Sequence, residues 1–429
     1  MQDNLFLALE KYNYWNSRPE NLGLKRSFYL EKLHKWSGTN LIKVVTGQRR
    51  VGKSYLFKQY IDLLLSNGVA PGNIFYFPRE AIEFTDIDDF RKLNDLFETY
   101  KSELKPEGRV YVFIDEIQMV DGWEHFVNSL SQLSGGQCEV FITGSNSTLL
   151  SSELTGLLSG RYIAFEMYPF SFEEYCEFSG LSQGRNSFKK FLLDTGMPEA
   201  LKLSDKEMKN NYFSVLFDTI VLRDVVQRYG VKNINLLKEV FLFIISNIGN
   251  LTSFQNIVKY YKSKGLKTNY ETVSTYVEYL LQTYVIRQSL RYSVKSKSVL
   301  GAERKIYLND LGFRNYLLGY DPMSISYNLE NYVYISLISA GYKVYTGIVN
   351  DKEVDFIAKK NDIELYVQVA YSLSEEKAWH REHAVLESIN KPVYKLLVHA
   401  DDMEYSGKNG VKYIKAWELE RKLRVLEQL

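Results

Sequence analysis

A glycine- and lysine-containing motif of eight residues is the strongest chemical signal in this sequence. It reads Gly47-Gln48-Arg49-Arg50-Val51-Gly52-Lys53-Ser54 and lies between an apolar run and a helical pattern. Glycine lets the backbone N–H groups turn toward phosphate oxygens, and the start of the following helix adds partial positive charge. In such a loop Lys53 reaches the β- and γ-phosphates and Ser54 binds Mg²⁺. We therefore predict a nucleotide-phosphate site at residues 47–54.

Two adjacent acids, Asp115 and Glu116, end the apolar run at residues 110–114. A buried strand that ends in two carboxylates must place both against solvent or a partner. Beside a phosphate loop, Asp115 is expected to hold Mg²⁺ through water, near Ser54, and Glu116 to orient and polarise the attacking water. The alternative is a solvated acidic turn.

Polar residues also follow the apolar run 139–144, where Ser145 and Asn146 are the next two residues. Ligands in open α/β sheets bind at the carboxyl ends of strands, so either side chain can contact the γ-phosphate or the water. A capped turn is the alternative for this pair. Arg161, just before the run 162–167, is either an arginine finger acting in trans or the partner of a surface acid.

Short apolar runs alternate with helical patterns around these residues. The runs span 41–47, 73–77, 110–115, 139–144 and 162–167, and the clearest helical patterns span 54–66 and 123–133. This alternation predicts a doubly wound α/β layer with a parallel sheet. Residues 171–230 read as helical, with capping boxes expected at Ser171/Glu174 and Ser204/Glu207.

Seven motifs in this order resemble a prokaryotic family of AAA-type P-loop ATPases over almost the whole chain. They are GQRRVGKS (47–54), FIDEIQ (113–118), FITGSN (141–146), LLSGRYIAFEMYPFSFEEY (157–175), GMPEAL (196–201), KIYLNDLGFRNYLLG (305–319) and EVDF (353–356). The resemblance implies ATP and Mg²⁺ at the loop and a core sheet in the order 5-1-4-3-2. It also implies that the Gly196-Met197-Pro198 turn, in a helical lid, contacts the nucleotide. A plain helix start at Pro198 is the alternative.

The fold class implied by the resemblance is α/β: an AAA-type P-loop ATPase core with a lid, a winged helix and a restriction-endonuclease-like domain. The expected segments are an N-terminal helical segment (1–36), the ATPase core (37–170), the lid (171–230), the winged helix (231–300) and the nuclease-like domain (301–429).

The expected winged helix carries a local positive charge. Three helices are expected from Ile234, Ser253 and Asn269, and a strand pair around 285–292 and 304–308. Residues 251–305 hold ten Lys and Arg against three Glu, a local charge of +7. Such a segment can bind double-stranded DNA through phosphate contacts, or serve only protein contacts with solvated lysines. The candidate DNA contacts are Lys259, Lys262, Lys264, Lys267, Lys295 and Lys297.

The C-terminal segment resembles the PD-(D/E)xK nuclease frame, with strands expected near 342–347, 353–358, 363–370 and 392–398. That frame uses acids to hold Mg²⁺ and a lysine to help activate water. Glu330 and Asp355 match acids of the frame, but Gln368 and Ala370 replace the second acid and the lysine. We therefore predict a nuclease-like fold without nuclease activity, unless Glu364 serves as a shifted ligand. His380 and His383 are expected to be surface residues.

Composition limits the remaining classes. A net charge of +1 excludes a uniformly basic nucleic-acid binder. Two Cys and five His do not supply a disulfide scaffold or a usual structural zinc site, and the chain is expected to be cytoplasmic. No apolar stretch approaches the ~18 residues of a membrane span.

The leading hypothesis is an Mg²⁺-dependent ATPase whose nucleotide state repositions the lid and the winged helix. The alternative is a nucleotide-gated DNA- or protein-binding switch with negligible turnover. An ATP-dependent nuclease is disfavoured by Gln368 and Ala370. Arg161 acting in trans would require a homo-oligomer, and the sequence leaves the partner open.

Overall fold

The computed structural model describes residues 2–18, 20–133, 137–150, 158, 160–319, 324–350 and 352–426. The chain divides into two compact units, Met1–Met167 and Tyr168–Leu429. We describe each unit by itself.

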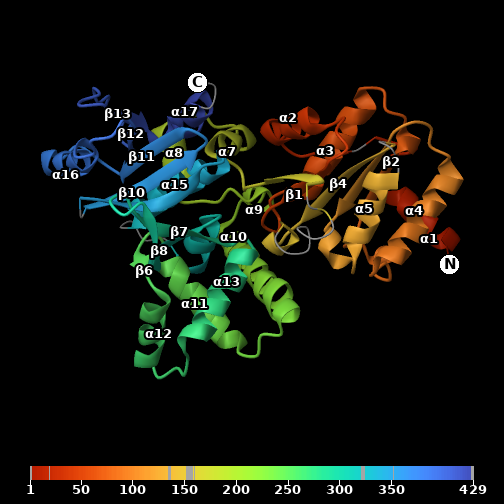
Figure 1. Ribbon diagram of the computed structural model, residues 1–429, viewed down its shortest axis with the longest axis horizontal. Helices are drawn as coiled ribbons and strands as arrows, with labels where there is room; N and C mark the ends of the chain where they lie inside the picture. The colour runs from red at the N-terminus through yellow and green to blue at the C-terminus, as the bar shows by residue number, and fades with distance from the viewer. Residues whose placement is uncertain are drawn as a thin grey trace. The chain divides into compact units, whose positions relative to one another are not determined.

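The first unit is built on a five-stranded parallel sheet (Figure 1). Its strand order, β2-β3-β4-β1-β5, is the expected 5-1-4-3-2 order. The apolar runs became strands within one or two residues of the expected bounds, because they are buried on both faces. The strands are β1 (Ile42–Thr46), β2 (Ile74–Pro78), β3 (Val110–Asp115), β4 (Cys138–Gly144) and β5 (Tyr162–Glu166).

Helices cover both faces of this sheet. Helices α1 (Gln2–Tyr12), α4 (Phe90–Leu104) and α5 (Trp123–Leu133) pack on one face, against alternate strand residues such as Val112 and Ile114. On the other face Phe113 and Phe141 stack at 4.6 Å. Phe57 of α3 (Lys53–Ser66) packs on Phe113 there, and α2 (Ser27–Trp36) contacts α3. The doubly wound layer is therefore confirmed.

The second unit begins with helices. They are α7 (Phe172–Ser179), α8 (Arg185–Leu192), α9 (Pro198–Leu201) and α10 (Lys206–Thr219), followed by a π-helical stretch (Ile220–Gln227). The capping box of Ser171 and Glu174 is present. The box predicted at Ser204 and Glu207 is wrong, because Asp205 caps α10 by accepting from the Met208 N–H. Aspartate is as good an N-cap as serine, and the helix begins one residue later.

Three helices and a hairpin follow in the predicted order. The helices are α11 (Ile234–Ser246), α12 (Phe254–Ser263) and α13 (Tyr270–Gln282), and the hairpin pairs β7 (Ile286–Ser293) with β8 (Ser298–Leu308). Ser253 and Asn269 accept backbone N–H bonds at the starts of α12 and α13, as predicted. A short strand, β6 (Leu251–Thr252), was not predicted.

The hairpin is part of the sheet of the C-terminal segment. One eight-stranded sheet has the order β13-β12-β11-β10-β9-β7-β8-β6, and β7 pairs in parallel with β9. The segment boundary expected at residue 300 falls inside β8. The remaining elements are α14 (Gly312–Leu317), α15 (Ile325–Ser339), β9 (Lys343–Val349), β10 (Lys352–Lys360), β11 (Ile363–Ala370), α16 (Glu376–Glu387), β12 (Tyr394–His399), β13 (Val411–Lys415) and α17 (Leu419–Leu426).

Within the ranges described, every helix is too short or too polar to cross a membrane.

Candidate nucleotide site

The phosphate loop has the strand–loop–helix setting that its sequence predicts. Residues 47–54 leave β1 and enter α3, whose N-cap is Gly52. Gly52 has a left-handed backbone (φ 102°), and Gly47 has φ 145°. A Cβ atom on Gly47 would lie 2.3 Å from the carbonyl oxygen of Met167. Both glycines are therefore required by the backbone of this loop.

Lys53 folds back over the loop. Its Nζ donates to the carbonyl oxygens of Gly47 at 2.9 Å and Gln48 at 3.2 Å. The same Nζ lies 3.4 Å from Oε1 of Glu116. The ammonium is buried, so an approaching phosphate would replace neutral carbonyls and one carboxylate as its partners.

Asp115 ends β3 beside the loop. Its Oδ1 accepts from Thr143 Oγ1 at 2.5 Å, and it also bonds the Ser54 hydroxyl. Burial and the neighbouring charge of Glu116 raise the pKa of Asp115. A buried carboxylate next to a hydroxyl supplies the hard oxygen ligands that Mg²⁺ prefers. Asp115 and Ser54 therefore fit the predicted magnesium site.

Glu116 is held at both carboxylate oxygens. Its Oε2 accepts from Gln118 Nε2 at 2.5 Å and from Ser145 Oγ at 2.8 Å, while Oε1 faces Lys53. Burial raises the pKa of Glu116, but the charges of Lys53 and Arg49 and the two hydrogen bonds lower it overall to about 2. The carboxylate is therefore ionised at neutral pH in this arrangement.

Three contacting residues were not singled out from the sequence. Gln118 and Thr143 lie within the quoted FIDEIQ and FITGSN motifs, and Thr143 Oγ1 also accepts from the Glu116 N–H. Glu80, two residues after β2, accepts from Arg49 at 2.8 Å. Their position as polar residues at strand ends was the signal in the sequence that could have found them. Which of these side chains contact one another depends on which strands are neighbours in the sheet.

Ser145 and Asn146 are both buried just after β4. Ser145 Oγ donates to Glu116 Oε2 at 2.8 Å, and contact of either side chain with the γ-phosphate or the water stays a prediction. Arg161 is exposed, and its Nη1 donates to Oδ1 of Asn128 at 2.6 Å. This partner is an amide and not the surface acid named as the alternative. The role of Arg161 as an arginine finger stays a prediction.

Pro198 lies in the second unit, at the first residue of α9. The turn before it is held by Asp310, which accepts from the Thr195 hydroxyl at 2.6 Å and the Gly196 N–H at 2.7 Å. This arrangement fits a plain helix start, and the contact of Pro198 with nucleotide stays a prediction.

All six candidate DNA-contact lysines are exposed. Lys259 and Lys262 lie on α12, Lys264 and Lys267 follow it, and Lys295 and Lys297 lie in the β7–β8 turn. Helix α13 itself, YETVSTYVEYLLQ, carries no Lys or Arg. The positive charge is therefore on the second helix and the hairpin turn, not on the third helix.

The nuclease-like acids surround a lysine. Lys305 Nζ lies 2.9 Å from Glu330, 2.8 Å from Glu353 and 3.8 Å from Asp355. Burial lowers the pKa of Lys305, but the three carboxylates outweigh it and raise that pKa overall. The ammonium lies among the acids that would face a divalent cation and offsets one of their charges, so these residues as arranged do not fit a magnesium centre.

The replaced positions of the frame make internal contacts. Gln368 Nε2 donates to Glu382 at 2.7 Å, and the Val369 N–H donates to Asp355 at 2.8 Å. Ala370 is buried at the end of β11. Glu364 faces Lys359 at 3.3 Å. Each of these side chains therefore has a packing or pairing role within the fold.

The expectation for His383 is wrong. His380 is exposed, but His383 is buried, stacks on Trp379 at 4.6 Å and bonds the Tyr413 hydroxyl at 2.8 Å. Residues three apart lie near one another on a helix, so His380 sits at the solvent-exposed edge of the face on which His383 is buried. Among the described residues, no group of three or more His, Cys, Asp or Glu is arranged to hold a metal ion.

Comparison with known proteins gives the family. Residues 39–176 match the AAA domain, and residues 185–324 match a domain of unknown function, DUF8612. The chain is 34% identical over 403 residues to an uncharacterized protein of Haemophilus influenzae, covering 92% of this chain and 99% of that relative. The chain belongs to the family of that relative. A further relative, an uncharacterized protein of Methanocaldococcus jannaschii, is 31% identical over 358 residues. The matched region covers 78% of this chain and 76% of that relative.

Solved structures similar to this family member are distant in sequence. The Aeropyrum pernix Orc1 protein in complex with DNA covers 70% of this chain and 94% of its own, with 12% identity and a TM-score of 0.33. AMPPCP-bound DnaA from Aquifex aeolicus covers 61% of this chain and 90% of its own, with 13% identity and a TM-score of 0.32. The AAA-domain match and the strand order show an AAA-type P-loop ATPase fold.

Proposed function

We propose that this chain is an Mg²⁺-dependent ATPase whose nucleotide state repositions a winged helix and an inactive nuclease-like segment on DNA. The observation that carries the proposal is the contact of Lys53 with Glu116 across the phosphate loop, at 3.4 Å. It joins the residue expected to bind phosphate to the residue expected to activate water.

ATP binding would change the protonation chemistry of Glu116. A γ-phosphate competes with the carboxylate for the Lys53 ammonium. Loss of that neighbouring charge raises the pKa of Glu116 from about 2 toward the working pH, which makes it a better base. The hydrogen bonds from Gln118 and Ser145 would keep its carboxylate in place for the attacking water.

Mg²⁺ would be held by Ser54 and Asp115, where it would neutralise charge on the phosphates. Thr143 holds Asp115 from β4, so the carboxylate is already oriented.

Movement of the lid would be transmitted to the sheet of the second unit through the hydrogen bonds of Asp310. Asp310, two residues after β8, binds both Thr195 and Gly196 of the turn before Pro198. A nucleotide that displaces this turn would therefore pull on the end of β8, whose hairpin carries Lys295 and Lys297.

The test is steady-state ATP hydrolysis, with Mg²⁺, by the wild-type chain and the Glu116→Gln variant. We expect Glu116→Gln to keep nucleotide binding and lose turnover by about 100-fold or more. The control is Glu98→Gln, an exposed acid on α4 whose ion pair with Lys101 contributes little. Turnover by Glu116→Gln equal to that of Glu98→Gln would exclude Glu116 as the base.

A second experiment adds duplex or single-stranded DNA to the same hydrolysis assay. It also measures the affinity for DNA as a function of salt concentration. Replacing Lys259, Lys262, Lys264 and Lys267 by alanine should lower the salt slope by about 0.9 for each lost phosphate contact on duplex. Replacing Lys25 and Lys35, two exposed lysines of the first unit, by alanine is the control. An unchanged slope would favour a protein partner.

A nucleotide-gated switch with negligible turnover is the second candidate. The observation that favours it is the low pKa of Glu116, about 2, which makes a weak base unless Lys53 moves away. Tight ATP binding without turnover above the Glu116→Gln level would support this candidate.

A further inference from the structure

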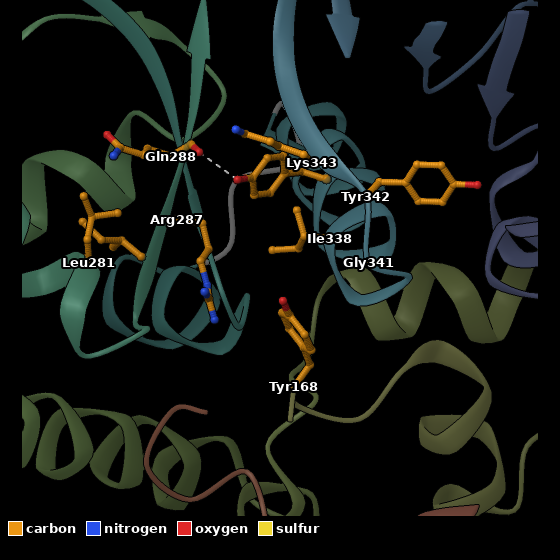
Figure 2. Close-up of a pocket in the computed structure, with 10 residues that line it drawn as sticks. Tyr168, Leu281, Arg287, Gln288, Ile338, Gly341, Tyr342 and Lys343 are labelled. Atoms are coloured by element: carbon orange, nitrogen blue, oxygen red, sulfur yellow. Dashed lines mark hydrogen bonds between the residues drawn. The ribbon is translucent and has the colours of Figure 1, made fainter. Parts of the chain in front are cut away.

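A cavity in the second unit has the lining of an anion site (Figure 2). Its volume is about 450 Å³, within the range of roughly 300–1,000 Å³ that is usual for small-ligand sites. It lies where β7 and β9, which are parallel neighbours, begin. Ten residues line it, two of them, Arg287 and Lys343, are cations, and none is an acid.

The cations reach the cavity from different strands. Arg287 is on β7, and its guanidinium points toward Tyr168, whose side chain rises from the opposite side (Figure 2). Lys343 begins β9, is exposed and lies at the rim. Two cations at one cavity favour a ligand with at least one negative charge.

The centre of the cavity suits a planar group. The Arg287 guanidinium lies 5.4 Å from the Tyr168 ring centre and 4.7 Å from that of Tyr284. Ile338 adds an apolar surface facing the same space, and the Tyr334 hydroxyl is held aside by the Gln288 carbonyl at 2.8 Å. The Tyr342 ring points away. Aromatic and aliphatic walls beside cations bind a base through its face and a phosphate through its charge.

We propose that this cavity binds a nucleoside phosphate, with Arg287 and Lys343 contacting the phosphate and Tyr168 and Ile338 packing against the base. The Arg287 guanidinium donates to Oδ1 of Asn309 at 3.2 and 3.3 Å. This amide is neutral and burial still lowers the pKa of Arg287 to about 10, so an anion would supply the opposite charge that the amide lacks. The site shares no residue with the phosphate loop, and the proposal holds whether or not the chain hydrolyses ATP. The nucleoside phosphate is either a free nucleotide or an unpaired nucleotide of a strand.

Two binding measurements on the full-length Lys53→Ala chain test the proposal, because this change removes the main phosphate contact of the loop. One is calorimetric titration with AMP, and the other is fluorescence anisotropy of a labelled single-stranded tetranucleotide. We expect Arg287→Gln to weaken binding about tenfold or more, and Lys343→Ala severalfold. For the tetranucleotide, each lost cation should lower the salt slope by about 0.7.

The control variant is Lys412→Ala, an exposed lysine of β13 outside the cavity, which should leave both affinities unchanged. Binding of AMP alone would identify a free nucleotide as the ligand, and binding of the tetranucleotide alone a strand. Lys343 is exposed, so its variant reports on the site even if Arg287→Gln melts early in a thermal scan. The proposal is overturned if neither probe binds at millimolar concentration, or if Arg287→Gln and Lys343→Ala bind like Lys412→Ala.

Discussion

Lys53 and Glu116 face each other across the phosphate loop, with Nζ 3.4 Å from Oε1, and both side chains are buried. The residue predicted to bind phosphate therefore pairs with the residue predicted to activate water. Lys53 and Glu116 lie 63 residues apart in the chain and meet because β1 and β3 both flank β4.

Replacing Lys53 by alanine should weaken ATP binding by about 30-fold or more. The change removes a buried ammonium, and loss of one partner of a buried charge pair typically costs about 2–5 kcal/mol. Titration with a fluorescent ATP analogue measures the loss. Lys35→Ala, an exposed lysine on α2, should bind like the wild type. Equal affinity for the two variants would mean that the loop does not contact phosphate through Lys53.

Replacing Gln118 by alanine should lower kcat about tenfold and leave the affinity for ATP nearly unchanged. Gln118 bonds Glu116 and Ser145, so its loss would free the Glu116 carboxylate to rotate without touching the phosphate loop. Steady-state kinetics separate the two quantities. The matched control is Gln137→Ala, an exposed glutamine before β4. A large rise in KM with an unchanged kcat would assign Gln118 to binding instead.

Replacing Glu420 by glutamine should stabilise the chain at pH 8 and not at pH 5. Burial raises the pKa of Glu420 to about 7. Because the folded pKa is above the unfolded value, the stability due to this group is complete below pH 4.5 and is lost as pH rises through 7. Glutamine stays neutral and keeps an acceptor for the Phe172 N–H.

The free energy of unfolding lost through Glu420 as pH rises is at most about 3 kcal/mol. Because the residue is half-buried, screening by solvent makes this loss smaller. Thermal melting at both pH values measures it as a rise of a few degrees in Tm at pH 8. Glu278→Gln, at an exposed glutamate of α13, should leave Tm unchanged at both. A rise of the same size at pH 5 would show that the gain does not come from the charge.

Replacing Lys305 by methionine should destabilise the chain by about 3–5 kcal/mol. The carboxylates of Glu330, Glu353 and Asp355 would lose their common ammonium, and an unpaired buried charge is costly. Urea denaturation measures the change, with exposed Lys352→Met as the control. A loss below 1 kcal/mol would mean that solvent already screens the acids.

The wild-type chain should leave supercoiled plasmid uncut in Mg²⁺ or Mn²⁺, because Gln368 and Ala370 replace the second acid and the lysine of the nuclease frame. Cleavage that disappears in Asp355→Ala would show that the centre is an active nuclease.

Local patterns in the sequence were sufficient for most elements of the first unit. A run such as 110–115 favours a buried strand, because it is short, mostly apolar on both faces and rich in β-branched and aromatic residues. Glycines at 47 and 52 allow the loop that joins β1 to α3. Ser253 and Asn269 marked two helix starts because capping depends on only four consecutive residues. The phosphate loop and the acid pair were readable for the same reason.

Only the tertiary structure decided which distant side chains meet. Gln118, Thr143 and Glu80 became site residues because neighbouring strand ends bring them to the loop. Lys305 came to lie among Glu330, Glu353 and Asp355 because β7 pairs with β9 and joins the hairpin to the C-terminal sheet. His383 turned inward for a similar reason, since only packing decides which face of α16 is covered. Pairing between strands depends on the summed burial of whole surfaces, so no short stretch of residues specifies it.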